Sequence, residues 1–147
     1  MLLGLLLLGI LLIFSQRDRK LLVMDADTGE IYGAYSVDTD EVFSLEFVHS
    51  VNQTPVIDEF RVTEEGFDAY RTIYSSLGAG VQTELREGET LTYDEDGNMV
   101  IAGFDLHYKE LNLMVGTVSD HVLTLQGERI SLRDLCGRNA SVVLKIR

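Results

Sequence analysis

The chain has 147 residues, enough for one domain with a buried core but too few for two full domains. Its 24 acidic residues against 12 lysines and arginines give a net charge of −12, which argues against binding to nucleic acid, because phosphates require a basic surface. A single cysteine excludes an internal disulfide and any cysteine-rich zinc site.

The first element in chain order is an apolar N-terminal segment. Residues 2–14 are apolar apart from two glycines, and residues 17–20 add three basic side chains and one aspartate. A membrane-spanning helix needs roughly 20 apolar residues, whereas the core of a signal peptide needs about 7–15. We therefore expect residues 1–16 to form a signal anchor or short transmembrane helix. A cleaved signal peptide is the alternative, and the lack of a polar face disfavours a buried core helix.

From residue 20 onward the hydrophobic pattern has a period of two, and turn residues separate the segments. About nine short strands joined by hairpins predict an all-β antiparallel sandwich or barrel, with residues 20–147 as a single β domain. One short helix is expected near the C-terminus, where Ser131 is a suitable N-cap, Asp134 occupies the capping-box position and Gly137 follows the last turn. The expected strands are Leu21–Met24, Ile31–Tyr35, Val42–Val51, Val56–Thr63, Phe67–Tyr74, Leu91–Tyr93, Met99–Ile101, Leu111–Val115, His121–Leu125 and Val142–Ile146.

The strand expected at 42–51 places a histidine in its apolar row. His49 has the same parity as the phenylalanines and the leucine that precede it, so it needs a hydrogen-bond partner or lies at the open end of the core. A polar turn with one proline follows, and the chain then returns as the next strand. Two interpretations are open: a capped turn with a satisfied histidine, or a polar pocket at the hairpin tip formed by His49, Ser50, Thr54, Asp58 and Glu59.

Two later segments are candidates for the same site. His121 begins a second apolar row with Leu123 and Leu125, so both histidines would line one site if their strand ends lie together. Gly78 and Gly80 flank an alanine after a predicted strand. Their N–H groups suit an anion or a carboxylate, although such a stretch is also typical of a tight connection.

Motifs of several enzyme classes are absent from the sequence. No Gly-x-Ser-x-Gly surrounds a serine, and there is no phosphate loop or dinucleotide fingerprint. The acidic loops at 25–29 and 94–97 lack the spacing of a calcium-binding EF-hand loop, and the histidines lack a metal-binding spacing. We therefore expect no catalytic residues, no metal and no cofactor.

Three segments are similar to a known family. Phe47–Phe60, with the string His-Ser-Val-x-x-Thr-Pro-Val, the element Leu77–Gly80, and Val115-Gly116 followed by His121 resemble the bacterial domain-of-unknown-function family 1850. The resemblance extends from Lys20 to the C-terminus. It implies a small protein with an N-terminal apolar segment, often encoded beside a tripartite transporter with a TAXI-type solute-binding protein, and no established enzymatic activity.

The resemblance also implies site residues and a location. The sequence departs from the family at Leu77, where an aromatic or Ser–Phe context is expected, and at Phe60, where tyrosine is common. The family context implies an extracytoplasmic domain, whereas basic residues after the apolar block favour the cytoplasm. We follow the resemblance, because one aspartate among three basic residues makes a weak topogenic signal. The family motifs fall on His49, Ser50, Thr54 and Glu59, on Gly78 and Gly80, and on His121.

We therefore expect a non-enzymatic accessory module, anchored by residues 1–16 with its β domain outside the cytoplasmic membrane. It would bind a transporter component or a small carboxylate solute through these seven candidate residues. Two alternatives are open. One is a metal-assisted or His/Glu-dependent hydrolase that uses His49, Glu59 and His121, and the other is a purely structural β domain without a ligand.

Overall fold

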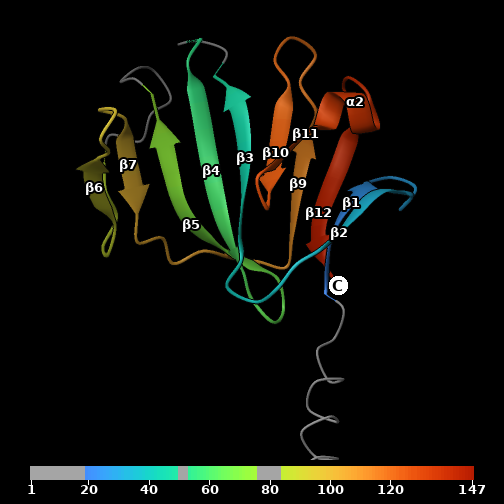
Figure 1. Ribbon diagram of the computed structural model, residues 1–147, viewed down its shortest axis with the longest axis horizontal. Helices are drawn as coiled ribbons and strands as arrows, with labels where there is room; N and C mark the ends of the chain where they lie inside the picture. Colours follow the sequence, from blue (N-terminus) through green and yellow to red (C-terminus); the bar gives the residue numbers. More distant parts are fainter. Residues whose placement is uncertain (1–18, 50–52, 76–83) are drawn as a thin grey trace, which may run out of the picture.

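The computed structural model describes residues 19–49, 53–75 and 84–147. The predicted anchor at residues 1–16 lies outside them, and no helix within the described part of the chain is long and apolar enough to cross a membrane. The described elements (Figure 1) are β1 (Lys20–Asp25), β2 (Ile31–Ser36), β3 (Val42–Val48), β4 (Pro55–Val62), β5 (Phe67–Tyr74), β6 (Thr90–Tyr93), β7 (Met99–Ala102), β8 (His107–Tyr108), β9 (Glu110–Met114), β10 (His121–Leu125), β11 (Glu128–Ser131), α2 (Leu132–Cys136) and β12 (Ser141–Ile146).

The strands form two antiparallel sheets. The smaller sheet has the order β2-β1-β12-β9, and the larger runs β11-β10-β3-β4-β5-β7-β6 with β8 paired to β5. In Figure 1 the larger sheet continues through β5, β7 and β6 away from the smaller one. The predicted all-β antiparallel fold with one short helix near the C-terminus is confirmed, and β8 and β11 are strands that the sequence pattern did not predict.

The core lies between the inner faces of the two sheets. The larger sheet contributes Phe43 and Phe67, whose rings meet edge to face with centroids 5.1 Å apart, and the smaller sheet contributes Leu21 and Val142. None of these four side chains is more than 1% exposed. Burial of each such side chain stabilises the fold by about 1.5–3 kcal/mol, so the period-two rows account for how the sheets associate.

The pairing of β3 with its neighbours defines which residues share the inner face. Phe47 lies opposite Val56 of β4 and opposite His121 of β10, and Leu45 lies opposite Asp58. Directly opposite residues in a ladder point to the same side of the sheet. Asp58 and His121 therefore belong to the same inner face as the aromatic core.

A β-bulge changes the register between β4 and β5. Tyr70 is an extra residue in β5, so Tyr70 and Arg71 together oppose Glu59. Beyond the bulge, Thr72 lies opposite Asp58. The bulge therefore turns Thr72 toward the inner face, where it meets Asp58.

Helix α2 begins and ends at the residues that the sequence predicts. The Ser131 hydroxyl accepts a hydrogen bond from the Asp134 N–H at 3.0 Å, and Gly137 follows the last turn with a φ of 94°. This N-cap satisfies one of the N–H groups that a helix leaves unpaired at its start. The cap also fixes α2 directly after β11, beside the loop that precedes β10.

Candidate functional site

An aspartate lies in the apolar inner row of β4. Asp58 alternates with Val56 and Phe60, both of which are buried. The Thr72 hydroxyl donates a hydrogen bond to Asp58 Oδ1 at 2.7 Å. Burial raises the pKa of the Asp58 carboxyl above its usual range, whereas the hydrogen bond from Thr72 acts in the opposite direction. Because a desolvated carboxylate needs partners, Asp58 is the first candidate for a binding group.

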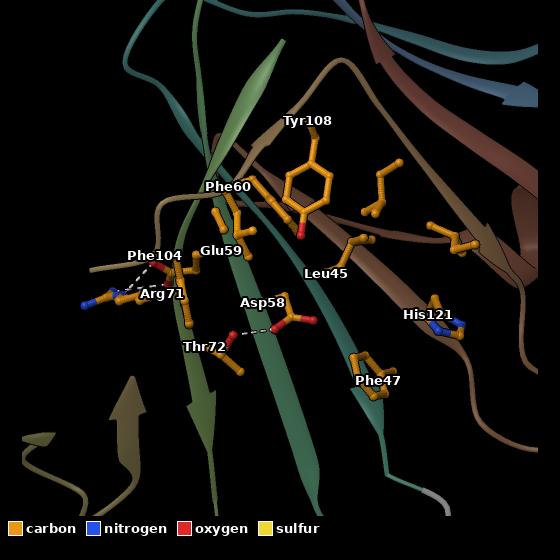
Figure 2. Close-up of a pocket in the computed structure, with 14 residues that line it drawn as sticks. Leu45, Phe47, Asp58, Glu59, Phe60, Arg71, Thr72, Phe104, Tyr108 and His121 are labelled. Atoms are coloured by element: carbon orange, nitrogen blue, oxygen red, sulfur yellow. Dashed lines mark hydrogen bonds and ion pairs between the residues drawn. The ribbon is translucent and has the colours of Figure 1, made fainter. Parts of the chain in front are cut away.

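Asp58 borders a cavity of about 310 Å³ between the two sheets (Figure 2). Leu111 and Leu113 of β9 line it from the smaller sheet, and strands β3, β4, β5 and β10 line it from the larger one. Sites for small molecules are typically mostly apolar, with a few polar groups and volumes of about 300–1,000 Å³. The aromatic lining residues are Phe47, Phe60, Phe104 and Tyr108.

A second polar group reaches the cavity from β8. Figure 2 shows the Tyr108 hydroxyl pointing toward the middle of the cavity. The Tyr108 ring packs against Phe60 and Phe67, with both centroid distances at 5.9 Å. Gly66 allows this position, because a Cβ there would collide with the Tyr108 carbonyl oxygen. The short strand β8 is thus held against the start of β5.

His121 is the third polar group of the cavity. Its ring stacks on Phe47 with centroids 5.5 Å apart, and its Nδ1 accepts a hydrogen bond from the Gly116 N–H at 3.2 Å. The neutral ring therefore carries its proton on Nε2. Burial lowers the pKa of His121; nearby Asp120 opposes this effect and Arg133 reinforces it. His121 is consequently neutral at pH 7 and donates through Nε2.

The loop before His121 is fixed from both sides. Asp120 accepts hydrogen bonds from the Ser131 hydroxyl at 2.5 Å and from the Arg133 N–H at 3.0 Å. The Ser119 hydroxyl accepts a backbone N–H at the end of β3 at 3.1 Å. These bonds tie the β9–β10 connection to α2 and to β3, so the imidazole is held in one orientation.

The other predicted histidine lies in the turn after β3. The His49 N–H donates to the Thr54 carbonyl and the Gln53 N–H donates to the His49 carbonyl, both at 2.9 Å. This closed turn explains why β3 is shorter than the expected strand at 42–51. His49 and His121 both line a hollow of about 590 Å³, so the structure brings the two predicted histidines together. Thr54 contributes its carbonyl to the turn.

Glu59 is engaged by its neighbour on β5. Arg71 Nε lies 2.6 Å from Glu59 Oε2, and a second guanidinium nitrogen lies 3.1 Å from Oε1. Such a bidentate pair fixes both side chains. Val56 of β4 and His121 of β10 lie at the same level, because both are opposite Phe47 of β3. Glu59 is three residues further along β4, which corresponds to about 10 Å along the strand. Glu59 and His121 thus lie on opposite sides of the cavity (Figure 2).

Three predicted binding residues, Ser50, Gly78 and Gly80, lie outside the described residues. Within residues 19–49, 53–75 and 84–147, no three His, Cys, Asp or Glu side chains are grouped so that they would hold a metal ion. The candidate site is therefore described by Asp58, Thr72, Tyr108 and His121, together with the apolar walls around them.

The sequence placed both Asp58 and Glu59 in the possible polar pocket at the hairpin tip, but only Glu59 is among the seven predicted binding residues. The signal for Asp58 was its parity, because it interrupts the apolar row of Val56, Phe60 and Val62. Thr72 and Tyr108 gave no comparable signal. The first depends on a bulge and the second on a strand of two residues.

Comparison with known proteins gives one match. A family model described as Domain of unknown function (DUF1850) matches residues 43–132, more than half of the chain. No curated protein and no solved structure matches the sequence. The four residues that describe the candidate site, from Asp58 to His121, all lie within the matched region.

Proposed function

The chain belongs to the DUF1850 family, and we propose that it is a non-enzymatic binding module. Its ligand is a small molecule held in the cavity between the two sheets. Asp58, Tyr108 and His121 supply the polar contacts, and the leucines of β9 with the aromatic rings of the larger sheet supply the apolar walls.

One observation carries the proposal: Asp58 lies on an apolar face beside a cavity, without a cation of the described chain against it. Burial of a carboxylate costs free energy unless partners compensate for the lost water. An apolar residue at this position would serve stability better. Costly polar groups are retained mainly where they have a function, and a ligand that reaches Asp58 offsets the cost.

Two features favour binding over catalysis. Glu59, the base that a hydrolase would need, is paired with Arg71 through both carboxylate oxygens. Among the described residues, no hydroxyl or thiol is hydrogen-bonded to His121, although activation of a nucleophile by histidine requires such a contact. Glu59 is therefore held in an ion pair, and His121 is placed to donate a hydrogen bond through Nε2 and not to activate a nucleophile.

The membrane anchor at residues 1–16, the position outside the cytoplasmic membrane and the transporter partner stay predictions from the sequence. They are consistent with the proposal, because a tethered domain that holds a small solute would act close to a membrane carrier. The binding site itself does not depend on them, since every residue that forms it belongs to the β domain.

Blocking the cavity tests the proposal. Leu113→Trp places an indole in the cavity, whereas Met114→Trp places one on the exposed face of β9 and is the matched control. Three phenyl probes of similar shape are used: 2-phenylethylammonium, 2-phenylethanol and 3-phenylpropionate. We expect ligand-observed NMR to detect binding of at least one probe to the full chain and to the Met114→Trp variant, but not to the Leu113→Trp variant. If no probe binds, or if Leu113→Trp has no effect, the proposed function is wrong.

A further inference from the structure

We propose that the ligand of this cavity is an organic cation, a primary ammonium group on a small apolar or aromatic body, with Asp58 as its counter-ion. The inference rests on the proposed function and adds the chemical class of the ligand. It departs from the small carboxylate that the sequence suggested. The charge balance, the hydrogen-bonding capacity and the wall composition of the cavity each support it.

The charge balance of the lining residues leaves Asp58 uncompensated. Arg71 and Glu59 neutralise each other through two short contacts. His121 carries no charge at pH 7, because burial holds its pKa below the usual range. The remaining charge is that of the Asp58 carboxylate, so a ligand ammonium is attracted to the cavity and a ligand carboxylate is repelled.

The hydrogen-bonding capacity of the cavity also suits an ammonium group. Asp58 accepts a bond from Thr72 at Oδ1, and no described residue donates to Oδ2. A primary ammonium has three donors, and charge-assisted bonds to a carboxylate are among the strongest in proteins. The Tyr108 hydroxyl, which points toward the same space in Figure 2, is available to accept a second bond.

The walls of the cavity are suited to the rest of such a ligand. Phe47, Phe60, Phe104 and Tyr108 present aromatic rings, and aromatic faces attract cations that lie within about 6 Å. Leucines line the side that belongs to β9. The volume of about 310 Å³ is at the lower end of the range for small-molecule sites, which favours a ligand with a single ring or a short branched chain.

Binding of such a cation must depend on pH. Protonation of Asp58 removes the counter-charge, and protonation of His121 adds a positive charge, so both oppose the cation as the pH falls. The other titratable groups that line the cavity are Glu59 and Arg71, which pair with each other, and Tyr108. Because burial raises the pKa of Asp58, the loss of binding begins at a higher pH than an exposed aspartate would allow.

Calorimetric titration of the full chain with the same three probes tests the ligand class. At pH 8 we expect 2-phenylethylammonium to bind at least about tenfold more tightly than 2-phenylethanol, and 3-phenylpropionate to bind least. Asp58→Asn should reduce the affinity for the ammonium probe by about tenfold or more and leave the affinity for the alcohol unchanged. Asp96→Asn removes a charge from an exposed loop and is the matched control.

The outcomes separate this inference from the proposed function. Equal affinity for the ammonium and the alcohol, or an unchanged ammonium affinity in the Asp58→Asn variant, overturns the ligand class and leaves the binding module intact. Failure of all three probes overturns both. A further test uses the wild type alone, titrated with the ammonium probe between pH 8 and pH 4. An affinity that does not decrease as the pH falls also overturns the ligand class.

Discussion

The inner face of the larger sheet has a closed end and an open end, and both are built from the same strands. At the closed end, Phe43 of β3 and Phe67 of β5 meet Leu21 and Val142 of the smaller sheet, and all four are buried. Strands β1 and β12 supply this cover. The result is a closely packed core of apolar side chains from both sheets.

At the open end the same strands continue, but a different strand of the smaller sheet lies across from them. Phe47, Asp58 and Thr72 follow along β3, β4 and β5, and they border the cavity with His121 of β10. The smaller sheet contributes side chains of β9 there. The period of two therefore decides which face is inner, whereas the partner across the core decides whether a position is packed or open.

Deleting one side chain at each end gives the largest expected difference. Phe67→Ala removes a ring that contacts Phe43, Phe60 and Tyr108, so we expect the free energy of unfolding to fall by about 3–5 kcal/mol. Leu113→Ala should cost only about 1 kcal/mol, because Leu113 already borders a cavity. Urea denaturation measures both values, and equal costs would show that the two ends are packed alike.

Removing the half-buried charge of the open end should stabilise the protein. We expect Asp58→Asn to raise the free energy of unfolding by about 1 kcal/mol at pH 8, because the amide needs no charge desolvation and still accepts from Thr72. The closed end offers no equivalent substitution, since the buried side chains that meet there are apolar.

The pH dependence of this gain has a defined sign. The folded-state pKa of Asp58 is raised, so the folded wild type binds its proton more tightly than the unfolded chain does. The destabilisation is complete above the folded pKa and absent below the unfolded pKa of about 3.9. The gain from Asp58→Asn should therefore shrink as the pH falls from 8 to 4. Urea denaturation at several pH values checks this, and a gain that stays constant would contradict it.

The smallest expected effect on stability is that of Glu59, the predicted site residue that forms an ion pair with Arg71. Glu59→Gln should lower the free energy of unfolding by at most about 1 kcal/mol, because Arg71 is 41% exposed and water replaces part of the lost interaction. Probe affinity should not change. Glu46→Gln, which breaks a more exposed pair with Arg129, is the control and should cost less. A loss of probe binding in Glu59→Gln alone would return Glu59 to the binding site.

Much of the fold was readable from the sequence because it depends on local patterns. The apolar rows of β3, β4 and β10 follow strict alternation, and the cap of α2 is visible as Ser131 followed by Asp134. The same alternation placed His121 at the start of an apolar row, where its register with Phe47 puts it at the cavity. The alternation and the cap need no knowledge of distant contacts, whereas the register of β10 with β3 does.

The site was less predictable because it depends on long-range contacts. Leu113 becomes a cavity wall only through the pairing of β9 with β12, which the local pattern does not encode. Tyr108 reaches the cavity from a two-residue strand that is held beside Gly66. Asp58, like His121, is detectable from alternation, as a charge in an apolar row, although the family motif falls on the neighbouring Glu59.

The bulge at Tyr70 determines the chemistry of the interior as well as its shape. In a regular β5, Arg71 would take the position opposite Asp58, and a guanidinium would satisfy the carboxylate from within the chain. The charge of Asp58 would then be neutralised within the protein, and the cavity would not attract a charged ligand. The additional residue places Arg71 opposite Glu59 instead, on the other side of the strand. The counter-ion of Asp58 must therefore come from outside the chain.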